Sequence, residues 1–145
     1  MKTQIAITVN GSSREAMEFY SQIFNVKFNM ATYGEIPPDP DNSLQESDKN
    51  KVAWGSIIIG DLKINFGDKL SAPPFVACDN VILHLMIEGA EEATRVFNEL
   101  KIEGEILEDL HEEFFADIYG KVMDKFGVIW NILGLGPIAY EKGIK

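Results

Sequence analysis

Hydrophobic and polar positions alternate with a period of two in several short segments of the chain, and two longer segments have helical spacing. The alternation predicts strands at residues 3–9, 26–33, 52–59, 62–66, 81–87, 105–107, 119–123 and 128–133. The helical spacing predicts one helix from Ser12 or Ser13 to Asn25 and another from Ala90 to about Ile102. The predicted order is therefore β-α-β-β-β, and it occurs twice.

This repeated order predicts an α+β fold made of tandem βαβββ modules in a single domain spanning residues 1–145. Module 1 covers about residues 1–68, a linker covers 69–79, and module 2 covers about 80–145. The linker contains Pro73-Pro74 and Asp79-Asn80, which favour irregular backbone. The two predicted helices share only a faint pattern, so the repeat is one of element order rather than of residue identity.

The segment 34–50 interrupts the alternation. It contains three prolines and five acidic residues but few apolar ones, and this composition predicts a long surface loop. A loop of this length is either a mobile excursion or a functional segment such as a lid, and the sequence leaves both open.

The final predicted strand has two apolar faces. Val128, Trp130 and Ile132 point to one side, and Ile129, Asn131 and Leu133 to the other. Such a strand should be covered on both sides, yet Asn131 is polar, and an unpaired buried amide costs roughly 1–3 kcal/mol. Asn131 is therefore either a core amide bonded to the backbone or a polar group that faces a covered concavity.

Composition narrows the classes of partner. No run approaches the ~20 apolar residues of a membrane helix, and the N-terminus has no signal-peptide pattern. The lone Cys78 suits a reducing cytoplasm, where we expect the protein, and its thiol is expected to be inert. A net charge of -10, with 13 basic residues among 23 acidic ones, argues against nucleic acid and anionic membranes as partners.

Several motifs resemble a known family. They are Asn10-Gly11 followed by Glu15-Ala16 and Phe19-Tyr20, then Tyr33-Gly34-Glu35, Ile59-Gly60-Asp61 and, most specifically, the stretch from Tyr119-Gly120-Lys121 through Asp124-Lys125-Phe126-Gly127 to Trp130. With the two βαβββ modules, the chain is similar to the vicinal oxygen chelate superfamily, which includes glyoxalase I, bleomycin-resistance proteins and extradiol dioxygenases, and within it to the PhnB-like branch.

The resemblance implies that each set of strands curls into an open, cup-shaped barrel with its helix outside, and that the protein is a homodimer. Metal-using members hold their ion with His and Glu side chains on the first and last strands of the modules. At the matching positions this chain has Gln4, His84 and Asn131. Neutral amides and one imidazole are weak ligands for a divalent ion, so we expect no cofactor and no catalytic metal. A site for Zn, Ni, Mn or Fe at His84 is the alternative.

His84 is the candidate catalytic residue, because an imidazole with a pKa of ~6.5 can act as a general base. The competing interpretation is a hydrogen-bonded wall residue. His111, beside Glu112 and Glu113, is expected to be solvated, although it could lie at the mouth of the cup. The remaining residues expected to line the cup and bind a ligand are Gln4, Trp54, Ser56, Ile58, Asn65, Met86, Phe115, Tyr119 and Asn131.

Aromatic walls with a few convergent amides describe a pocket for a small, partly apolar molecule. Alternatively, Trp54 and Phe115 fill the barrel or a dimer seam. The sequence has no phosphate-binding loop, zinc-spaced cluster or catalytic triad, and no Gly-rich motif within a βαβ unit that would support a methyltransferase. Three hypotheses follow: a metal-free small-molecule binding protein, a metal-dependent isomerase, lyase or dioxygenase, and a dimeric interaction module without a ligand.

Overall fold

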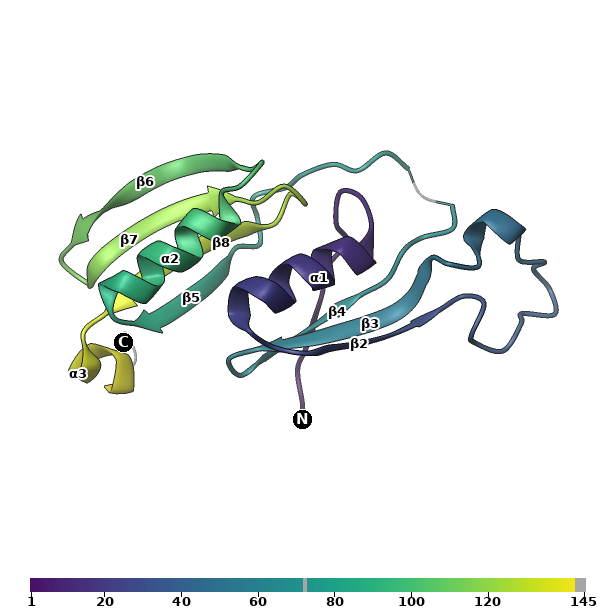
Figure 1. Cartoon of the computed structure of the whole chain (residues 1–145), viewed down its shortest axis with the longest axis horizontal. Helices are drawn as coiled ribbons and strands as arrows, with labels where there is room; N and C mark the ends of the chain where they lie inside the picture. Colours follow the sequence, from purple (N-terminus) through teal and green to yellow (C-terminus); the bar gives the residue numbers. More distant parts are fainter. Residues whose placement is uncertain (72, 143–145) are drawn as a thin grey trace. The chain divides into compact units, whose positions relative to one another are not determined.

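The computed structural model describes residues 1–71 and 73–142, and the chain divides into two compact units between Phe75 and Val76. Unit 1 has a four-stranded sheet in the order β1-β4-β3-β2 (Figure 1). Its elements are β1 (Ile5–Ala6), α1 (Ser13–Phe24), β2 (Phe28–Thr32), the 3-10 turn η1 (Glu46–Asp48), β3 (Val52–Ile59) and β4 (Leu62–Phe66).

Unit 2 repeats this topology, with the order β5-β8-β7-β6. Its elements are β5 (Leu83–Glu88), α2 (Ala90–Leu100), β6 (Glu105–Glu113), β7 (Ala116–Met123), β8 (Ile129–Leu135) and α3 (Pro137–Lys142). In both sheets the first strand pairs in parallel with the last, and all other pairs are antiparallel. The α+β fold of tandem βαβββ modules is thus confirmed, and both sheets are open.

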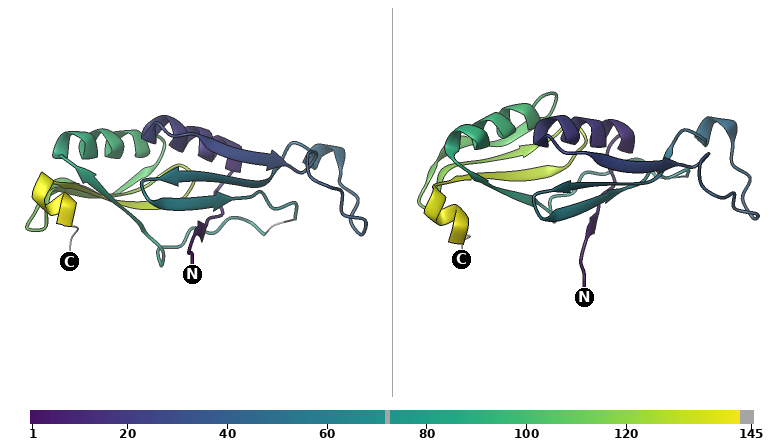
Figure 2. Two further views of the ribbon diagram at one scale, coloured as in Figure 1. Left: turned by 90° about the horizontal axis from the view of Figure 1, so that it is seen from below. Right: turned by 60° about the horizontal axis from the view of Figure 1, so that its bottom comes forward.

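In unit 1, α1 lies on one face of the sheet and leaves the other face uncovered by a helix (Figure 2). The Ser12 hydroxyl caps the first turn by accepting from the amide of Glu15, and Asn25 ends the helix in the left-handed conformation. The side chains buried against the sheet are Ala16, Met17, Tyr20 and Ile23.

In unit 2, α2 packs on β8, β7 and β5 through Ala93, Val96, Phe97 and Leu100. Two strand glycines permit this close approach. A Cβ on Gly120 would lie 2.8 Å from Phe97, and one on Gly134 would lie 2.9 Å from the Cβ of Ala93. The helix α2 therefore covers one face of this sheet and does not cover the opposite face.

The turn between β7 and β8 is built around the buried carboxylate of Asp124, which is 2% exposed. Its Oδ1 accepts from the amides of Phe126 (2.9 Å) and Val128 (3.1 Å), and its Oδ2 accepts from the indole of Trp130 (2.8 Å). Gly127 has a positive φ of 80°, which an L side chain rarely adopts. The residue types at Asp124, Gly127 and Trp130 are therefore explained by the hydrogen bonds and the backbone conformation of this turn.

Several predicted boundaries are corrected by the structure. The strand predicted at 105–107 extends to Glu113, and β7 begins at Ala116 rather than at Tyr119. The predicted strand ended before the acidic residues of 108–113, and Glu and Asp are depleted in strands in general. However, β6 is an edge strand, where charged residues are common. Conversely, the strand predicted at 3–9 is only Ile5–Ala6, and α3 was not predicted.

The loop predicted at 34–50 is present and exposed over most of its length, with η1 inside it. Its two ends are tied together, since the amides of Tyr33 and Gly34 donate to the carbonyls of Lys51 and Lys49.

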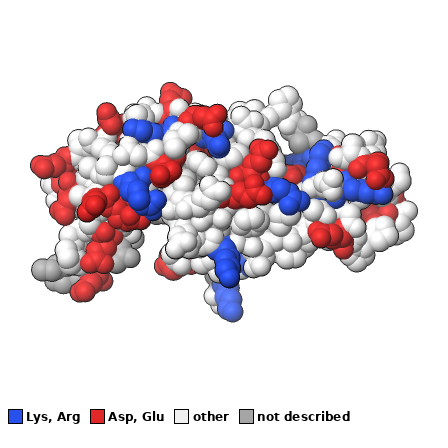
Figure 3. All heavy atoms as spheres, in the orientation of Figure 1, with Lys and Arg blue, Asp and Glu red and all other residues white. Residues whose placement is uncertain are grey.

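On the face seen in Figure 3, basic side chains are dispersed among acidic ones. Among the described residues no helix has the length and apolar character needed to cross a membrane.

We predict that replacing Asp124 with Ala lowers the free energy of unfolding by roughly 2–4 kcal/mol, because three donors lose their charged acceptor and two of them are buried. Urea unfolding followed by circular dichroism measures this. The control is Asp117→Asn, which removes one negative charge from an exposed position of the neighbouring strand. A loss below about 0.5 kcal/mol in the Ala variant would contradict the role assigned to the carboxylate.

Candidate functional site

The face of the second sheet opposite α2, called here the open face of unit 2, carries a row of polar side chains. Asn131 lies in the middle strand β8, paired in register with His84 of β5 on one side and with Lys121 of β7 on the other. Directly paired residues project from the same face of a sheet, so these three side chains stand together. Tyr119, two residues before Lys121, projects from the same face.

Hydrogen bonds connect three of these groups. The Tyr119 hydroxyl donates to Oδ1 of Asn131 (3.4 Å), and Nδ2 of Asn131 lies 3.2 Å from Nε2 of His84. In this orientation the Asn131 NH2 can only donate, so the contact corresponds to an accepting Nε2 of His84, which is the Nδ1–H tautomer. The amide of Asn131, only 7% exposed, is thereby satisfied by side chains and not by the backbone.

The other half of the open face is apolar. Met86 pairs with Leu133 beside the polar row, and its side chain is 49% exposed. Phe115 and Tyr119 pack against a small buried cluster of Ala116, Leu133 and Leu135, and their rings meet edge to face at 5.5 Å. The face therefore presents hydrogen-bonding groups next to an aromatic and aliphatic surface.

His111 stands at the edge of this face. It pairs in register with Tyr119, and the two rings form a T-shaped contact at 5.7 Å. Its Nδ1 lies 2.8 Å from the carbonyl of Asp109, and its Nε2 lies 3.1 Å from Glu113 and 3.5 Å from Glu108. The hydrogen bonds to the Asp109 carbonyl and to the Glu113 carboxylate raise the pKa of His111, and the charges of both glutamates add to this effect.

The same surroundings keep Tyr119 protonated. Burial raises the pKa of its phenol first, and the negative charges of Glu108 and Glu113 raise it further. A neutral phenol is a hydrogen-bond donor, as its contact with Asn131 requires. Burial and the charges of Glu108 and Glu113 thus favour the protonated phenol that donates to the central amide.

Unit 1 carries its own open face, opposite α1. There Nδ2 of Asn65 donates to Oε1 of Gln4 at 2.9 Å, and Asn65 pairs in register with Ser56. Trp54, two residues before Ser56, is 52% exposed. Of the residues predicted to line the cup or bind a ligand, these four and Ile58 share one face of unit 1, whereas His84, Met86, Phe115, Tyr119 and Asn131 share one face of unit 2.

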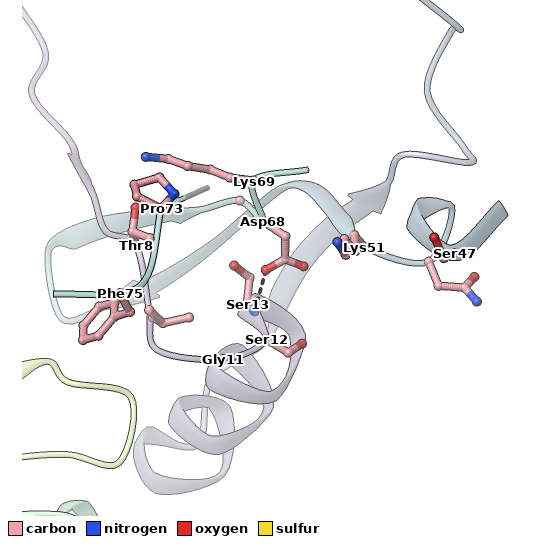
Figure 4. A pocket seen from close by; sticks show the side chains of 13 residues that line it. Thr8, Gly11, Ser12, Ser13, Ser47, Lys51, Asp68, Lys69, Pro73 and Phe75 are labelled. Atoms are coloured by element: carbon pink, nitrogen blue, oxygen red, sulfur yellow. Dashed lines mark hydrogen bonds between the residues drawn. The ribbon is translucent and has the colours of Figure 1, made fainter. Parts of the chain in front are cut away.

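The structure also contains a pocket of about 450 Å³ in unit 1, which the sequence did not predict (Figure 4). It lies at the start of α1, near Ser12, Ser13, Ser47, Asp68 and Lys69, and none of the predicted ligand-binding residues lines it. Its central carboxylate is engaged, because the oxygens of Asp68 accept from the amides of Ser13 (2.9 Å) and Val52 (2.8 Å). We therefore interpret Asp68 as a structural link and regard the open face of unit 2 as the candidate site.

The donor set does not fit the metal considered as an alternative. Within residues 1–71 and 73–142 no three His, Cys, Asp or Glu side chains are grouped so that they could hold a metal ion. The Nε2 lone pair of His84, which a metal would need, already accepts from Asn131. Glu108 and Glu113 are directed toward His111, not toward His84.

The sequence interpretation missed Lys121, Glu108 and Glu113, and it left open whether His111 is solvated or lies at the mouth of the cup. Truncating β6 at residue 107 hid the pairing that brings His111 against Tyr119. The alternation of Tyr119 and Lys121 on one strand was a signal that could have placed Lys121 on the same face as Asn131.

We predict that His84 is the Nδ1–H tautomer in the native protein and that Asn131→Leu allows both tautomers, because the amide donor to Nε2 is lost. Long-range proton–nitrogen correlation spectra of the imidazole measure the protonated nitrogen. The ring of His111 in the same spectra is the internal control. A proton on Nε2 in the native protein would show that the Asn131 amide has the opposite orientation.

We also predict that His111 titrates above the ~6.5 of an unperturbed histidine and that Glu113→Gln lowers its pKa. Since the folded-state pKa is the higher one, the stabilisation from this cluster is complete below about pH 6.5 and is lost as pH rises through the folded-state pKa. Proton NMR of the ring measures the titration. The control is Glu112→Gln, and a titration curve that is the same in the Glu113→Gln and Glu112→Gln variants would refute the contact.

Comparison with known proteins places the fold. A family model described as 3-demethylubiquinone-9 3-methyltransferase matches residues 1–133. Protein YjdN of Escherichia coli is 26% identical over 129 residues, which cover 84% of this chain and 87% of YjdN. The crystal structure of PA1353 from Pseudomonas aeruginosa is 25% identical, with a TM-score of 0.78 over 93% of this chain and 99% of that one.

Two further likenesses concern the fold alone. A PhnB protein from Bacillus cereus, titled a putative 3-demethylubiquinone-9 3-methyltransferase, is 23% identical with a TM-score of 0.72, over 92% of this chain and 98% of that one. The fosfomycin resistance protein FosX of Listeria monocytogenes is 15% identical with a TM-score of 0.60, over 98% of this chain and 95% of that one. The chain belongs to the family described as 3-demethylubiquinone-9 3-methyltransferase, in the PhnB-like branch of the vicinal oxygen chelate superfamily.

Proposed function

We propose that the protein binds a small, partly apolar molecule on the open face of unit 2 without a catalytic metal. The observation that carries this proposal is the chain of hydrogen bonds from Tyr119 through Asn131 to His84, set beside exposed apolar side chains. A side-chain network in a nearly buried position orients polar groups more firmly than flexible surface residues can.

The polar end offers donors to a ligand. With Nε2 of His84 engaged, its Nδ1–H is the group left to donate, and the Asn131 amide keeps a second hydrogen beyond the one given to His84. Because Nε2 is engaged, we assign His84 to binding rather than to general-base catalysis. The apolar end, with Met86, Phe115 and the ring of Tyr119, would cover the rest of the ligand.

Two enzymatic alternatives receive less support. FosX has been crystallised with Mn(II), but the described side chains of this chain do not form a group of donors that could hold such an ion.

Methyl transfer would require a bound methyl donor. The spacing of Gly134, Gly136 and Ala139 formally fits a Gly-rich nucleotide motif, but it begins within β8 and ends in α3, and no strand succeeds it in the part of the chain that the structure describes.

A dimeric interaction module without a ligand is the remaining alternative. The exposure of Trp54 (52%) and Ile58 (54%) on the open face of unit 1 favours it, since large apolar side chains exposed close together often mark interfaces. The homodimer implied by the family likeness stays a prediction and is compatible with ligand binding.

The proposal is tested by screening a library of small aromatic and aliphatic molecules against the 15N-labelled full chain. We expect binders to shift the side-chain amide signals of Asn131 and the signals of His84 and Phe115. Asn131→Leu should weaken binding at least tenfold, since a lost hydrogen bond in the site is worth about 1.4 kcal/mol. Asn98→Leu, which removes an exposed amide from α2, should leave binding unchanged.

The competing outcomes are distinct. A requirement for added Zn, Ni, Mn or Fe would favour the metal-dependent enzyme, and binding that persists in a chelator agrees with the proposal. Shifts centred on Asp68 and Lys69 would place the ligand in the unit 1 pocket. Absence of any shift on the open face of unit 2 would refute the proposal.

A further inference from the structure

Lys121 is a cation without an ionic partner among the described residues, and it stands on the open face of unit 2. It pairs in register with Asn131 on β8 and with Glu108 on β6. Nevertheless, in the described part of the chain no carboxylate lies within the 4.0 Å ion-pair distance of its ammonium group. Within the described residues, the ammonium group of Lys121 therefore stands unpaired beside the polar row of this face.

Two carboxylates near Lys121 are engaged with His111. Glu108 and Glu113 both approach Nε2 of His111, at 3.5 and 3.1 Å. Two further acids on the face, Glu88 and Asp117, lie four residues along their strands from His84 and Lys121, which is roughly 13 Å at ~3.3 Å per residue. Glu105 is nearer, since it pairs with Met123, two residues along β7 from Lys121. No carboxylate among the described residues forms an ion pair with Lys121 beside Asn131.

The three groups of the polar row can act on one ligand group. Strands in a sheet are ~4.8 Å apart, so His84 and Lys121 flank Asn131 at neighbouring positions across three strands. All three can donate: the Nδ1–H of His84, the amide of Asn131 and the ammonium of Lys121. Charge-assisted hydrogen bonds from such a set favour an acceptor that carries negative charge.

We propose that the molecule bound on this face is an organic acid, whose carboxylate is held by Lys121, Asn131 and His84 and whose apolar body lies against Met86, Phe115 and Tyr119. This inference rests on the proposed binding function and adds the chemical class of the ligand. Lys121 is the residue that determines the preference for a charged over a neutral head group.

The matched probes phenylacetate, phenylacetamide and 2-phenylethylamine test the inference, because they share a benzyl body and differ in head-group charge. Titration into the 15N-labelled full chain gives an affinity for each probe and locates it. We expect phenylacetate to bind at least tenfold more tightly than phenylacetamide and to shift the Asn131 side-chain amide. The preference should decrease between 0.01 and 1 M salt, since screening lengths fall from ~30 to ~3 Å.

Two variants separate charge from structure. Lys121→Met keeps an apolar stem of similar length, and we expect it to remove the preference for phenylacetate over phenylacetamide. Lys27→Met, which removes the same charge from an exposed position in unit 1, should preserve the preference. Retention of the native fold is checked by the dispersion of the amide spectrum.

The failures are distinguishable. If phenylacetamide or 2-phenylethylamine binds the face at least as tightly as phenylacetate, or if Lys121→Met leaves the preference intact, the inference is overturned while the binding function stands. If none of the three probes shifts the open face of unit 2, both the inference and the proposed function are overturned for this class of molecule.

Discussion

The buried amide of Asn131 is the constraint on which the candidate site depends. It is placed in a strand whose seven residues are all buried, and leaving it unpaired would cost roughly 1–3 kcal/mol. Its two ends are satisfied by Tyr119 and His84, which come from the strands on either side of it. Satisfying a single polar group therefore fixes the orientation of a phenol, an amide and an imidazole on the same face.

A second type of interaction stabilises the fold: a buried or half-buried aspartate accepts hydrogen bonds from backbone amides. Asp124 follows β7 and organises the turn into β8, and Asp68 follows β4 and joins the start of α1 to the start of β3. Each unit thus has an aspartate whose carboxylate accepts hydrogen bonds from two backbone amides in place of water. Within the most specific motif of the sequence, the turn around Asp124 thus maintains structure, whereas Tyr119 and Lys121 at its start stand on the open face of unit 2.

The two halves of the open face of unit 2 carry different kinds of side chain. Met86, Phe115 and the ring of Tyr119 form an apolar surface above the buried Leu133, whereas His84, Asn131 and Lys121 form a row of polar groups. His111 engages Glu108 and Glu113 at the edge, and Lys121 has no ion pair among the described residues.

Much of the fold could be predicted from local patterns. The strands 52–59 and 62–66 agree residue for residue, and the N-cap at Ser12 and the helix end at Asn25 follow from side-chain chemistry confined to a few neighbouring residues. Strand β6 could not be delimited, because its acidic residues are tolerated only by its position at the edge of the sheet, which depends on distant pairing.

The same division applies to the site. Alternation along β8 was sufficient to separate Asn131 from Trp130, because side-chain direction in a strand is a local property. The partners of Asn131 were decided by the parallel pairing of β5 with β8 and the antiparallel pairing of β7 with β8, which join residues 47 and 12 positions apart. Sequence thus determined which face each side chain occupies, whereas only tertiary structure decided which side chains meet there, since strand register is set by packing across the whole sheet.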